Sequence, residues 1–450
     1  MSSLADRLRG IVAAVPGAAE RARRDARERT RDGETLDSDG LSPAGASSTA
    51  EVLGGEWCDS GPHRFLVVNR TYRPGHRHGR LVLADHVLPE PEGWQDVLMT
   101  PSTGSGRSQE PPDGRTLFID LETTGLAGGA GTYAFLVGCA WFDGATFRVQ
   151  QFFMSSYAAE RSLLDALADT ARTCRLVVSY NGKTFDLPLI ETRFLFNRMS
   201  TPFADVPHLD MLHPARRLWR AEATGEETDG SCRLSTLEQT LCGHTREGDV
   251  PGFEIPARYF HYVRTGDARP LEGVLEHNRL DLLSLAFLTA RAAQLVEEGP
   301  PSVRTAREAV GLGRLYERAG VVSRARACFA RAAGLDGAHP LPGDQGARLD
   351  ALHAYAVVCR RQRQFADAAV AWQQLMELPG CPPRLLREAT EALAVHHEHR
   401  LRDPWTAHAF ATRALPLQAS TARRQALHHR LTRLDRKLAN RSARQAAALF

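Results

Sequence analysis

The 450-residue sequence predicts an α/β domain built on a mixed β-sheet with flanking helices, followed by an all-α domain of helical repeats. Between residues 115 and 298, short apolar runs typical of strands come first and helical periodicities follow, which indicates a mixed sheet covered by helices. Beyond residue 300 the chain is rich in Ala, Arg and Leu, with small residues at the spacing of packed helix pairs. The length also exceeds what one hydrophobic core usually accommodates and favours several domains.

The first 114 residues have less regular patterns. Residues 1–50 combine an amphipathic start with a Ser/Gly/Ala-rich stretch that is expected to be disordered. Residues 51–100 are expected to form a small β-rich segment, because apolar runs there are separated by Pro-Gly and His-Gly turns. Residues 101–114 have the composition of a linker into the next domain.

The central domain is expected to span residues 115–298. Its predicted strands are 116–120, 133–140, 146–153 and 175–179, with a short one at 207–210. Its predicted helices are 159–172, 187–198, 233–242 and 271–297. In sheets of this kind the functional site lies at the strand ends, and the polar residues there are the first candidates.

Residues 301–420 are expected to form tetratricopeptide-like helical repeats, a possible binding surface for a partner protein. The spacing L-G-x-x-Y…A-x-x-x-F-x-x-A is matched by Leu312-Gly313, Tyr316, Ala325, Phe329 and Ala332. Weaker matches follow at Ala368, Trp372 and Leu375, and at Ala407, Ala411 and Ala414. A plain helical bundle with the same small-residue packing is the alternative. Residues 421–450 hold seven arginines and Lys437 against Asp435, which predicts a basic helical tail that either binds phosphates or is simply solvated.

Composition excludes several classes of protein. The formal net charge is only +3, so any contact with nucleic acid must come from local patches. No apolar run approaches the roughly 20 residues of a membrane span, and the short apolar run near the N-terminus does not predict a signal peptide. The eight cysteines are scattered without a regular framework, which is typical of free thiols in a reducing compartment. We therefore expect a cytoplasmic protein.

The most informative motif is Phe118-Ile-Asp-Leu-Glu-Thr-Thr-Gly-Leu126. Side chains at positions i and i+2 of a strand share one face, so Asp120 and Glu122 are expected to point the same way at the end of a buried strand. Two adjacent carboxylates repel each other and need protons or a cation between them. Mg²⁺ and similar hard cations take oxygen ligands of this kind. The alternative is a solvated strand end with two unrelated acids.

A second acid follows a polar loop, Ser179-Tyr-Asn-Gly-Lys-Thr-Phe-Asp186. Asp186 falls at the start of a predicted helix, so it is either a further member of the acidic site or a helix cap. Asn181 and Lys183 lie in the loop, where they are candidates for contacts to a phosphate or sugar. Arg216 belongs to a small basic cluster and is a weaker candidate for the same role.

The third group lies within the long helix predicted at 271–297. His277 and Asp281 are four residues apart, so both project from one helical face. A histidine beside a carboxylate can act as a base in the neutral pH range. An ordinary surface pair is the alternative. His208 and Asp210, at the end of a short strand, are expected to support the fold.

Together these motifs resemble those of the DEDD 3′–5′ exonucleases, a superfamily with a ribonuclease H-like fold. The resembling segments are Asp120-Leu-Glu122, Asn181…Phe185-Asp186 and His277-x-x-x-Asp281. Further segments resemble the YprB-type bacterial branch: Gly128-Gly-Ala-Gly-Thr-Tyr-Ala-Phe135, Tyr180-Asn-Gly-Lys183, His213-Pro-Ala-Arg-Arg-Leu-Trp219, Arg233-Leu-Ser-Thr-Leu237, Val250-Pro-Gly252 and Glu276-His-Asn278. The resemblance covers residues 115–295, and tetratricopeptide-like tails also occur in that branch.

The resemblance implies roles for five residues. Asp120, Glu122, Asp186 and Asp281 would ligate a pair of Mg²⁺ or Mn²⁺ ions, and His277 would position or deprotonate a water. Here the sequence departs from the common pattern: the histidine subclass has H-x-x-x-x-D and the tyrosine subclass Y-x-x-x-D, whereas this chain has histidine at the tyrosine spacing.

The expected function is hydrolysis of phosphodiester bonds at single-stranded DNA or RNA 3′ ends by a divalent-metal-dependent 3′–5′ exonuclease, using a two-metal mechanism. Two alternatives stay open. One is a catalytically silent, nucleic-acid-associated scaffold whose helical repeats bind a partner protein. The other is a ribonuclease H-type endonuclease with the same fold and metals. Metals and acids contact only the phosphodiester, so the sequence does not discriminate DNA from RNA.

Overall fold

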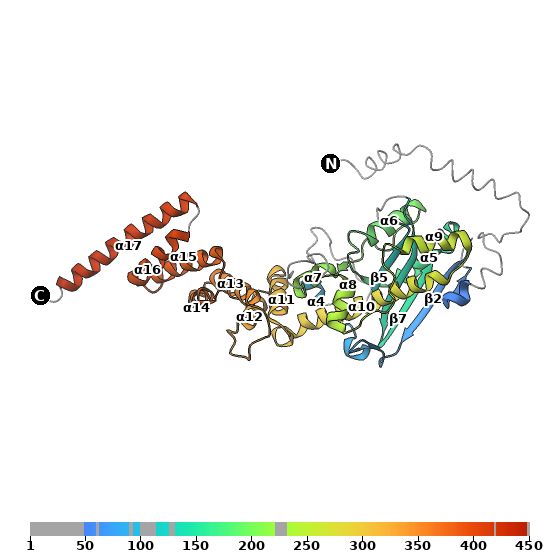
Figure 1. Ribbon diagram of the computed structural model, residues 1–450, viewed down its shortest axis with the longest axis horizontal. Helices are drawn as coiled ribbons and strands as arrows, with labels where there is room; N and C mark the ends of the chain where they lie inside the picture. Colours follow the sequence, from blue (N-terminus) through green and yellow to red (C-terminus); the bar gives the residue numbers. More distant parts are fainter. Residues whose placement is uncertain are drawn as a thin grey trace, which may run out of the picture.

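The computed structural model describes residues 49–59, 63–89, 93–99, 114–125, 131–220, 232–417 and 420–447. The predictions for residues 1–48, for most of the linker and for part of the motif at 128–135 lie outside the described residues. The molecule is elongated, with a sheet-containing domain at one end and a helical arm extending from it (Figure 1).

The domain is built on a seven-stranded mixed sheet with the order β1-β2-β7-β6-β5-β8-β9. Its strands are β1 (Glu56–Cys58), β2 (Phe65–Tyr72), β5 (Arg115–Thr123), β6 (Ala134–Asp143), β7 (Thr146–Phe153), β8 (Cys174–Ser179) and β9 (His208–Asp210). From β1 to β5 neighbouring strands are antiparallel, while β5, β8 and β9 run parallel. All five strands predicted for the central domain are therefore present, as is the mixed sheet.

Residues 51–100, expected as a small β-rich segment, are joined to this sheet. β2 pairs with β7 along its whole length, from Leu66 opposite Phe153 to Tyr72 opposite Phe147. The segment continues into a two-stranded hairpin, β3 (Arg77–His78) and β4 (Leu81–Val82), and into helix α4 (Trp94–Leu98). The apolar runs of this segment are thus buried by extending the sheet, because an isolated small hairpin would leave them exposed.

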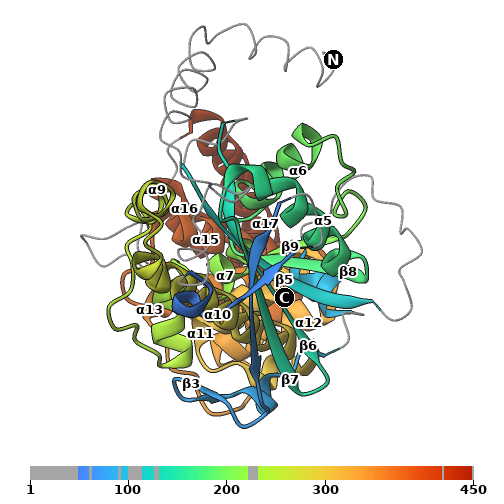
Figure 2. The ribbon, with the colours of Figure 1, turned by 90° about the vertical axis from the view of Figure 1, so that its right-hand side faces the viewer.

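Two layers of helices cover the sheet. The described helices of this domain are α5 (Glu160–Ala171), α6 (Asp186–Phe196), α7 (Leu212–Leu218), α8 (Leu234–Leu237), the π-helical turn η4 (Glu238–Cys242), α9 (Ile255–Thr265) and α10 (Glu272–Glu298). α5 and α10 lie on opposite sides of the sheet (Figure 2). Helices α7 and α9 were not predicted from the sequence; α7 is short and contains Pro214, and α9 begins with Ile255-Pro256 directly after the Pro251-Gly252 turn.

Alternate side chains of β5 enter different cores. Leu117, Ile119 and Leu121 pack with α5, α6 and α9. Phe118 packs in the core that includes the second half of α10. Since Asp120 and Glu122 share a face with Phe118, the strand directs both acids toward α10.

The arm consists of helical hairpins, as the small-residue spacing indicates. Its helices are α11 (Ala306–Arg318), α12 (Val322–Ala333), α13 (Gln345–Arg361), α14 (Phe365–Glu377), α15 (Pro383–His399), α16 (Pro404–Ala414) and α17 (Thr421–Ala447). In the first hairpin Gly313 lies against the ring of Phe329, so closely that a Cβ atom would come within 2.5 Å of it. The close approach of α11 and α12 explains why glycine stands at this position.

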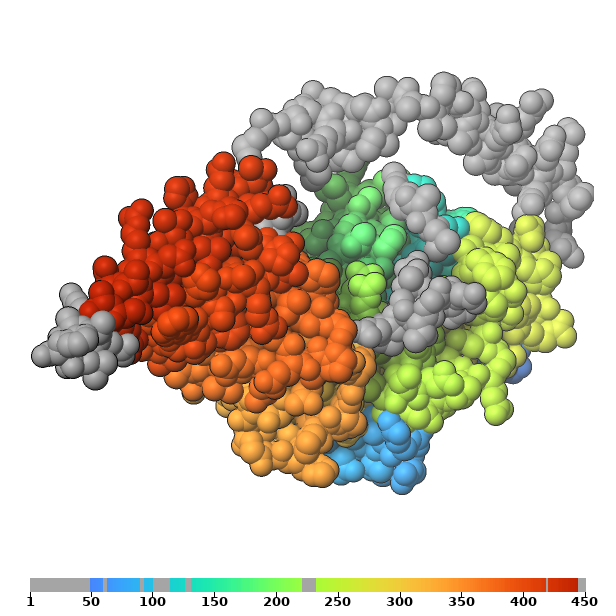
Figure 3. Space-filling model, turned by 60° about the vertical axis from the view of Figure 1, so that its left-hand side comes forward, coloured from blue at the N-terminus to red at the C-terminus, as the bar shows by residue number. Residues whose placement is uncertain are grey.

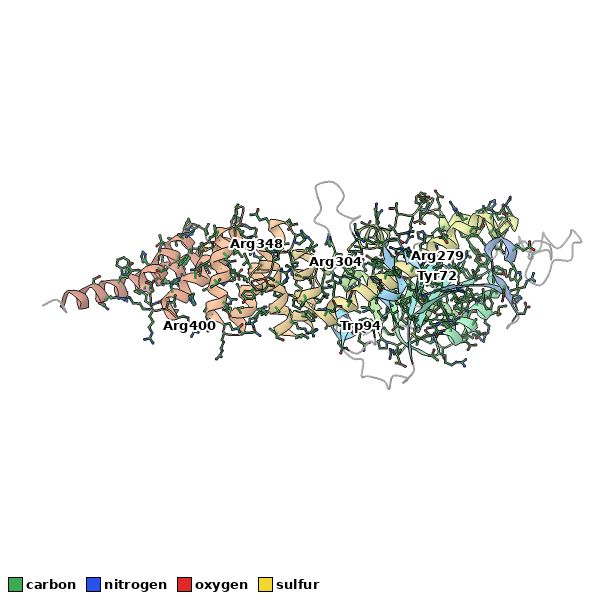
Figure 4. The ribbon with its side chains drawn as sticks, turned by 90° about the horizontal axis from the view of Figure 1, so that it is seen from below. Tyr72, Trp94, Arg279, Arg304, Arg348 and Arg400 are labelled. Atoms are coloured by element: carbon green, nitrogen blue, oxygen red, sulfur yellow. The ribbon has the colours of Figure 1, made fainter. Side chains whose placement is uncertain are left out.

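The arm is fixed to the sheet domain by buried contacts. Trp219 donates a hydrogen bond of 3.0 Å to Glu308, which also pairs with Arg291 of α10. Arg318 donates to the last carbonyl groups of α4, beside the buried Trp94. Figure 4 shows Trp94 near this junction, and Tyr72 next to Arg279, to which its hydroxyl is hydrogen-bonded.

Two further predictions concern membrane spans and cysteines. Among the described helices, none is long and apolar enough to cross a membrane. All eight cysteines, which lie in the described part of the chain, are free thiols.

Candidate active site

The site is formed by four carboxylates from three elements. Asp120 and Glu122 end β5, Asp186 is the first residue of α6, and Asp281 lies on α10. The sequence predicted these four as a group, and the structure brings them together. Their proximity is also electrostatic, because the charges of Asp186 and Asp281 raise the pKa values of both Asp120 and Glu122.

Three of the four acids have raised pKa values. For Asp120 and Glu122 burial is the main cause, and the charge of Asp281 is the next largest. The pKa of Asp186 is raised to about 7, first by burial and then by the charge of Asp210, with Asp281 adding to it. The charges of Asp186 and Asp281 therefore make ionisation of the two β5 acids less favourable. An all-oxygen set of this kind fits hard divalent cations, which would relieve the repulsion.

The Asp120 carboxylate is held in place by the side-chain amide of Asn278, to which the sequence analysis assigned no role. Asn278 donates 2.8 Å to the Asp120 carboxylate and 3.1 Å to its main-chain carbonyl. Its own carbonyl oxygen accepts from Gln151, which also donates to the carbonyl of Leu275. Gly138 on β6 faces this amide, and a Cβ atom there would collide with it. The orientation of Asp120 is thus fixed by a buried amide pair and a glycine.

Asp281 is held by Arg246, a residue that none of the sequence motifs includes. One guanidinium nitrogen lies 2.5 Å from Asp281, and another lies 2.5 Å from Glu238 of η4. The arginine side chain is 5% exposed and that of Glu238 is fully buried. A third contact of 3.3 Å reaches Asp249. Arg246 therefore compensates three carboxylates at the rim of the acidic cluster.

The Arg246 contacts continue into a buried network. Both Ser284, at 2.6 Å, and His78, at 2.8 Å, contact the other oxygen of Glu238. His78 belongs to the β3–β4 hairpin, and Arg80 of that hairpin donates to the last carbonyls of η4. His78, Glu238 and His244 place ligand-type atoms within 4.8 Å of one another. However, both oxygens of Glu238 are already hydrogen-bonded and the two imidazole rings are stacked.

His277 stands at the open side of the cluster. Its Nδ1 lies 2.7 Å from Asp249, and its Nε2 lies 3.6 Å from Asp281. A carboxylate on one ring nitrogen fixes the orientation of the ring and leaves the other nitrogen available. Asp249 precedes the Val250-Pro-Gly252 segment, and only the fold brings it to His277. The sequence contained no signal for this pairing.

The loop between β8 and α6 is organised by Asp210. Its carboxylate accepts main-chain hydrogen bonds from Asn181 at 2.7 Å and from Lys183 at 3.1 Å. Asn181 has a positive φ of 67°, and Gly182 lies so close to Ser179 that it has no room for a side chain. His208 is hydrogen-bonded to Ser179 at 2.7 Å. Asp210 and His208 thus support the fold, as expected.

A pocket of about 420 Å³ opens beside the acids. It is lined by residues of β5, of α6 and the loop before it, of α9 and of α10, including Glu122, Thr184, Phe185, Asp186, Pro188, Ile255 and His277. The ring of Phe185 is 55% exposed. Lys183 and Arg216 are exposed but do not line this pocket, so their predicted contacts to nucleic acid remain predictions.

Comparison with known proteins shows what the sheet-containing domain is similar to. Residues 117–293 match the RNase_H superfamily model. This span contains all four carboxylates, and the ribonuclease H-like fold predicted from the sequence is therefore confirmed.

Two individual proteins are also similar to this chain. The Bacillus subtilis (strain 168) protein with the name "Uncharacterized protein YprB" is 29% identical over 323 residues, which make up 71% of this chain and 74% of the relative. The family B DNA polymerase from the hyperthermophilic archaeon Pyrobaculum calidifontis matches 49% of this chain and 29% of its own, at 14% identity and a TM-score of 0.31. A structural similarity at this level carries no argument about function.

Proposed function

We propose that the protein is a divalent-metal-dependent 3′–5′ exonuclease of the DEDD type and the YprB-type branch. The observation that carries the proposal is the set of four carboxylates at the carboxyl end of β5, in which burial and neighbouring acids raise the pKa values of Asp120, Glu122 and Asp186. Such a set is costly unless it binds cations, and nothing in the packing of the domain requires four acids there. The RNase_H superfamily match adds that the fold suits nuclease chemistry.

In this proposal Asp120, Glu122, Asp186 and Asp281 hold two Mg²⁺ or Mn²⁺ ions, which when bound would activate water and stabilise the leaving oxygen. Asn278 keeps the Asp120 carboxylate pointed into the cluster. His277, oriented by Asp249, would accept a proton from the attacking water at Nε2, the ring nitrogen that faces Asp281 at 3.6 Å.

The pocket beside the acids has the properties of a site for a strand end. Its exposed Phe185 offers a face on which a terminal base can stack, and stacking of this kind tolerates any base. This supports a single-stranded end as the substrate, without distinguishing DNA from RNA. The helical arm, with tetratricopeptide-like spacing, is proposed as an additional binding surface, and the proposed compartment is the cytoplasm.

The test is degradation of 5′-labelled single-stranded DNA and RNA by purified protein with Mn²⁺, beside Asp120→Asn and Asp210→Asn. We expect a ladder that shortens from the 3′ end and is absent with Asp120→Asn. Asp210→Asn controls for disturbance of the neighbouring loop without loss of an acid that binds metal. Equal inertness of wild type and Asp120→Asn on every substrate would instead favour the silent scaffold. Cleavage that persists with a blocked 3′ end would favour the endonuclease.

A further inference from the structure

The far end of the helical arm has a net positive charge, whereas the rest of the chain has a net negative one. Residues 383–447 contain 13 Lys and Arg against 5 Asp and Glu, whereas the rest of the chain contains 43 basic and 48 acidic residues. The net charge of +3 is therefore the sum of a basic arm end and an acidic remainder. Helices α15 to α17 form this arm end, which projects away from the sheet domain (Figures 1 and 3).

A pocket of about 530 Å³ lies between α15 and α17. Arginines from both helices line it, together with two glutamates and a small apolar surface: Arg384, Arg387, Glu388, Glu391, Val395, Arg423, Ala426, Leu427 and Arg430. This volume is in the range of ligand-binding pockets. The pocket is not part of the acidic site, which lies in the other domain.

One of the four arginines that line this pocket, Arg430, is ion-paired, as are two basic residues beyond the pocket. The buried Glu398 pairs with Arg430, Arg433 and Lys437, which satisfies the cations on one side of α17. The pocket's two glutamates also have partners: Glu388 contacts His353 at 3.1 Å, and Glu391 has an interaction of its own.

The remaining arginines of the pocket lack such partners. Within the part of the chain that the structure describes, no carboxylate pairs with Arg384, Arg387 or Arg423. Arg384 and Arg423 are also exposed, so their guanidinium groups are accessible from solvent. Two turns of α15 and the first turn of α17 therefore present three uncompensated guanidinium groups to one cavity.

We propose that this pocket, the α15/α17 arginine pocket, binds the phosphate backbone of a single-stranded nucleic acid. The proposal rests on the proposed function, because it assigns to the same substrate a second contact far from the acids. A planar guanidinium group can donate two parallel hydrogen bonds to the oxygens of one phosphate. Three such groups around one cavity suit a row of successive phosphates better than a single carboxylate.

The distribution of charge favours nucleic acid over an acidic peptide. The basic surface continues along α17 beyond the pocket, through Arg436 and Arg441, which suits a polymer with one charge per residue. The sheet domain, in contrast, has clustered carboxylates at its own site and repels phosphates until cations are bound. A strand held on the arm gains affinity that the acidic domain alone does not supply.

The experiment measures binding of a 5′-labelled 30-nucleotide single strand to the full-length protein by fluorescence anisotropy in EDTA, where hydrolysis cannot occur. The test variant is Arg384→Gln/Arg387→Gln. The matched control is Arg348→Gln/Arg363→Gln, which removes the same charge from exposed positions of the arm outside the pocket. Figure 4 labels Arg348 on α13. All four substitutions are at surface positions, and circular dichroism checks that each variant is folded.

We expect the dissociation constant of the test variant to rise about tenfold or more and that of the control less than threefold. For the test variant, the slope of the logarithm of the binding constant against the logarithm of the salt concentration should become less steep by about 1.4. This is the value for the loss of two phosphate contacts to a single strand. Equal effects in both variants, or displacement of the strand by polyglutamate at the same charge concentration, would overturn the proposal.

A second measurement separates this proposal from the proposed nuclease function. Hydrolysis of a four-nucleotide strand with Mn²⁺ reports the acidic site alone, since such a strand is too short to occupy both sites. The test variant should retain that activity. If the wild type does not hydrolyse the short strand but the test variant still loses binding of the long one, only the nuclease proposal is refuted. If the wild type hydrolyses the short strand but the test variant binds the long one no worse than the control does, only the arginine-pocket proposal is refuted.

Discussion

Replacement of Arg246 by Met should destabilise the sheet domain by about 3–5 kcal/mol, the usual cost of breaking a buried ion pair from one side. The magnitude follows from the geometry. The side chain of Arg246 is 5% exposed and lies 2.5 Å from both Glu238 and Asp281, and Glu238 has no exposed surface. Without the arginine, a fully buried carboxylate keeps its charge but loses its cation.

The assay is urea unfolding in EDTA, with Arg314→Met as the matched control. Arg314 pairs with Asp350 at 3.3 Å, but both side chains are more than half exposed, so its loss should cost only about 0.2–1 kcal/mol. Arg246→Met/Glu238→Gln should recover part of the loss, since no unpaired buried charge remains. A cost for Arg246→Met no larger than that of the control would refute the reasoning.

Three further predictions concern the acids, their support and the pocket. Because the pKa of Asp186 is raised from 3.8 to about 7, its contribution to the stability of the metal-free protein is complete below about pH 4 and is lost as pH rises through 7. Asp186→Asn should therefore reduce the fall in unfolding free energy between pH 5 and 8 in EDTA, and parallel profiles for variant and wild type would contradict this. Gly138→Ala should cost about 1–3 kcal/mol in thermal unfolding, because its Cβ would displace the Asn278 amide. Gly131→Ala, with open space around its Cβ position, serves as control, and equal costs would exclude the collision. Phe185→Ala should weaken binding of a strand end by about 1–3 kcal/mol if the ring stacks on a base. Phe196→Ala, similarly exposed but outside the pocket, should leave binding unchanged, and an unaltered Kd for Phe185→Ala would exclude stacking.

The sequence by itself determined the strands that form the centre of the sheet and the set of acids at its edge. Strand β5 is a continuous apolar run that ends in Asp120 and Glu122, and strand geometry alone places these two side chains on one face. The helical hairpins of the arm follow from small residues at fixed spacing, such as Gly313 against Phe329. These features depend on residues close together in the sequence, so a single sequence is enough to predict them.

Only the tertiary structure decided which residues hold those acids in place. Arg246 meets Asp281, and His277 meets Asp249, across 35 and 28 residues of sequence. Asn278 meets Asp120 across 158. None of these pairs has a periodicity or spacing that marks it, since each contact is made by elements that the sheet and α10 bring together. The joining of residues 51–100 to the sheet, through β2 on β7, has the same origin. Pairing between distant segments depends on which surfaces remain to be buried once the whole chain has folded, and that is a property of the assembled core.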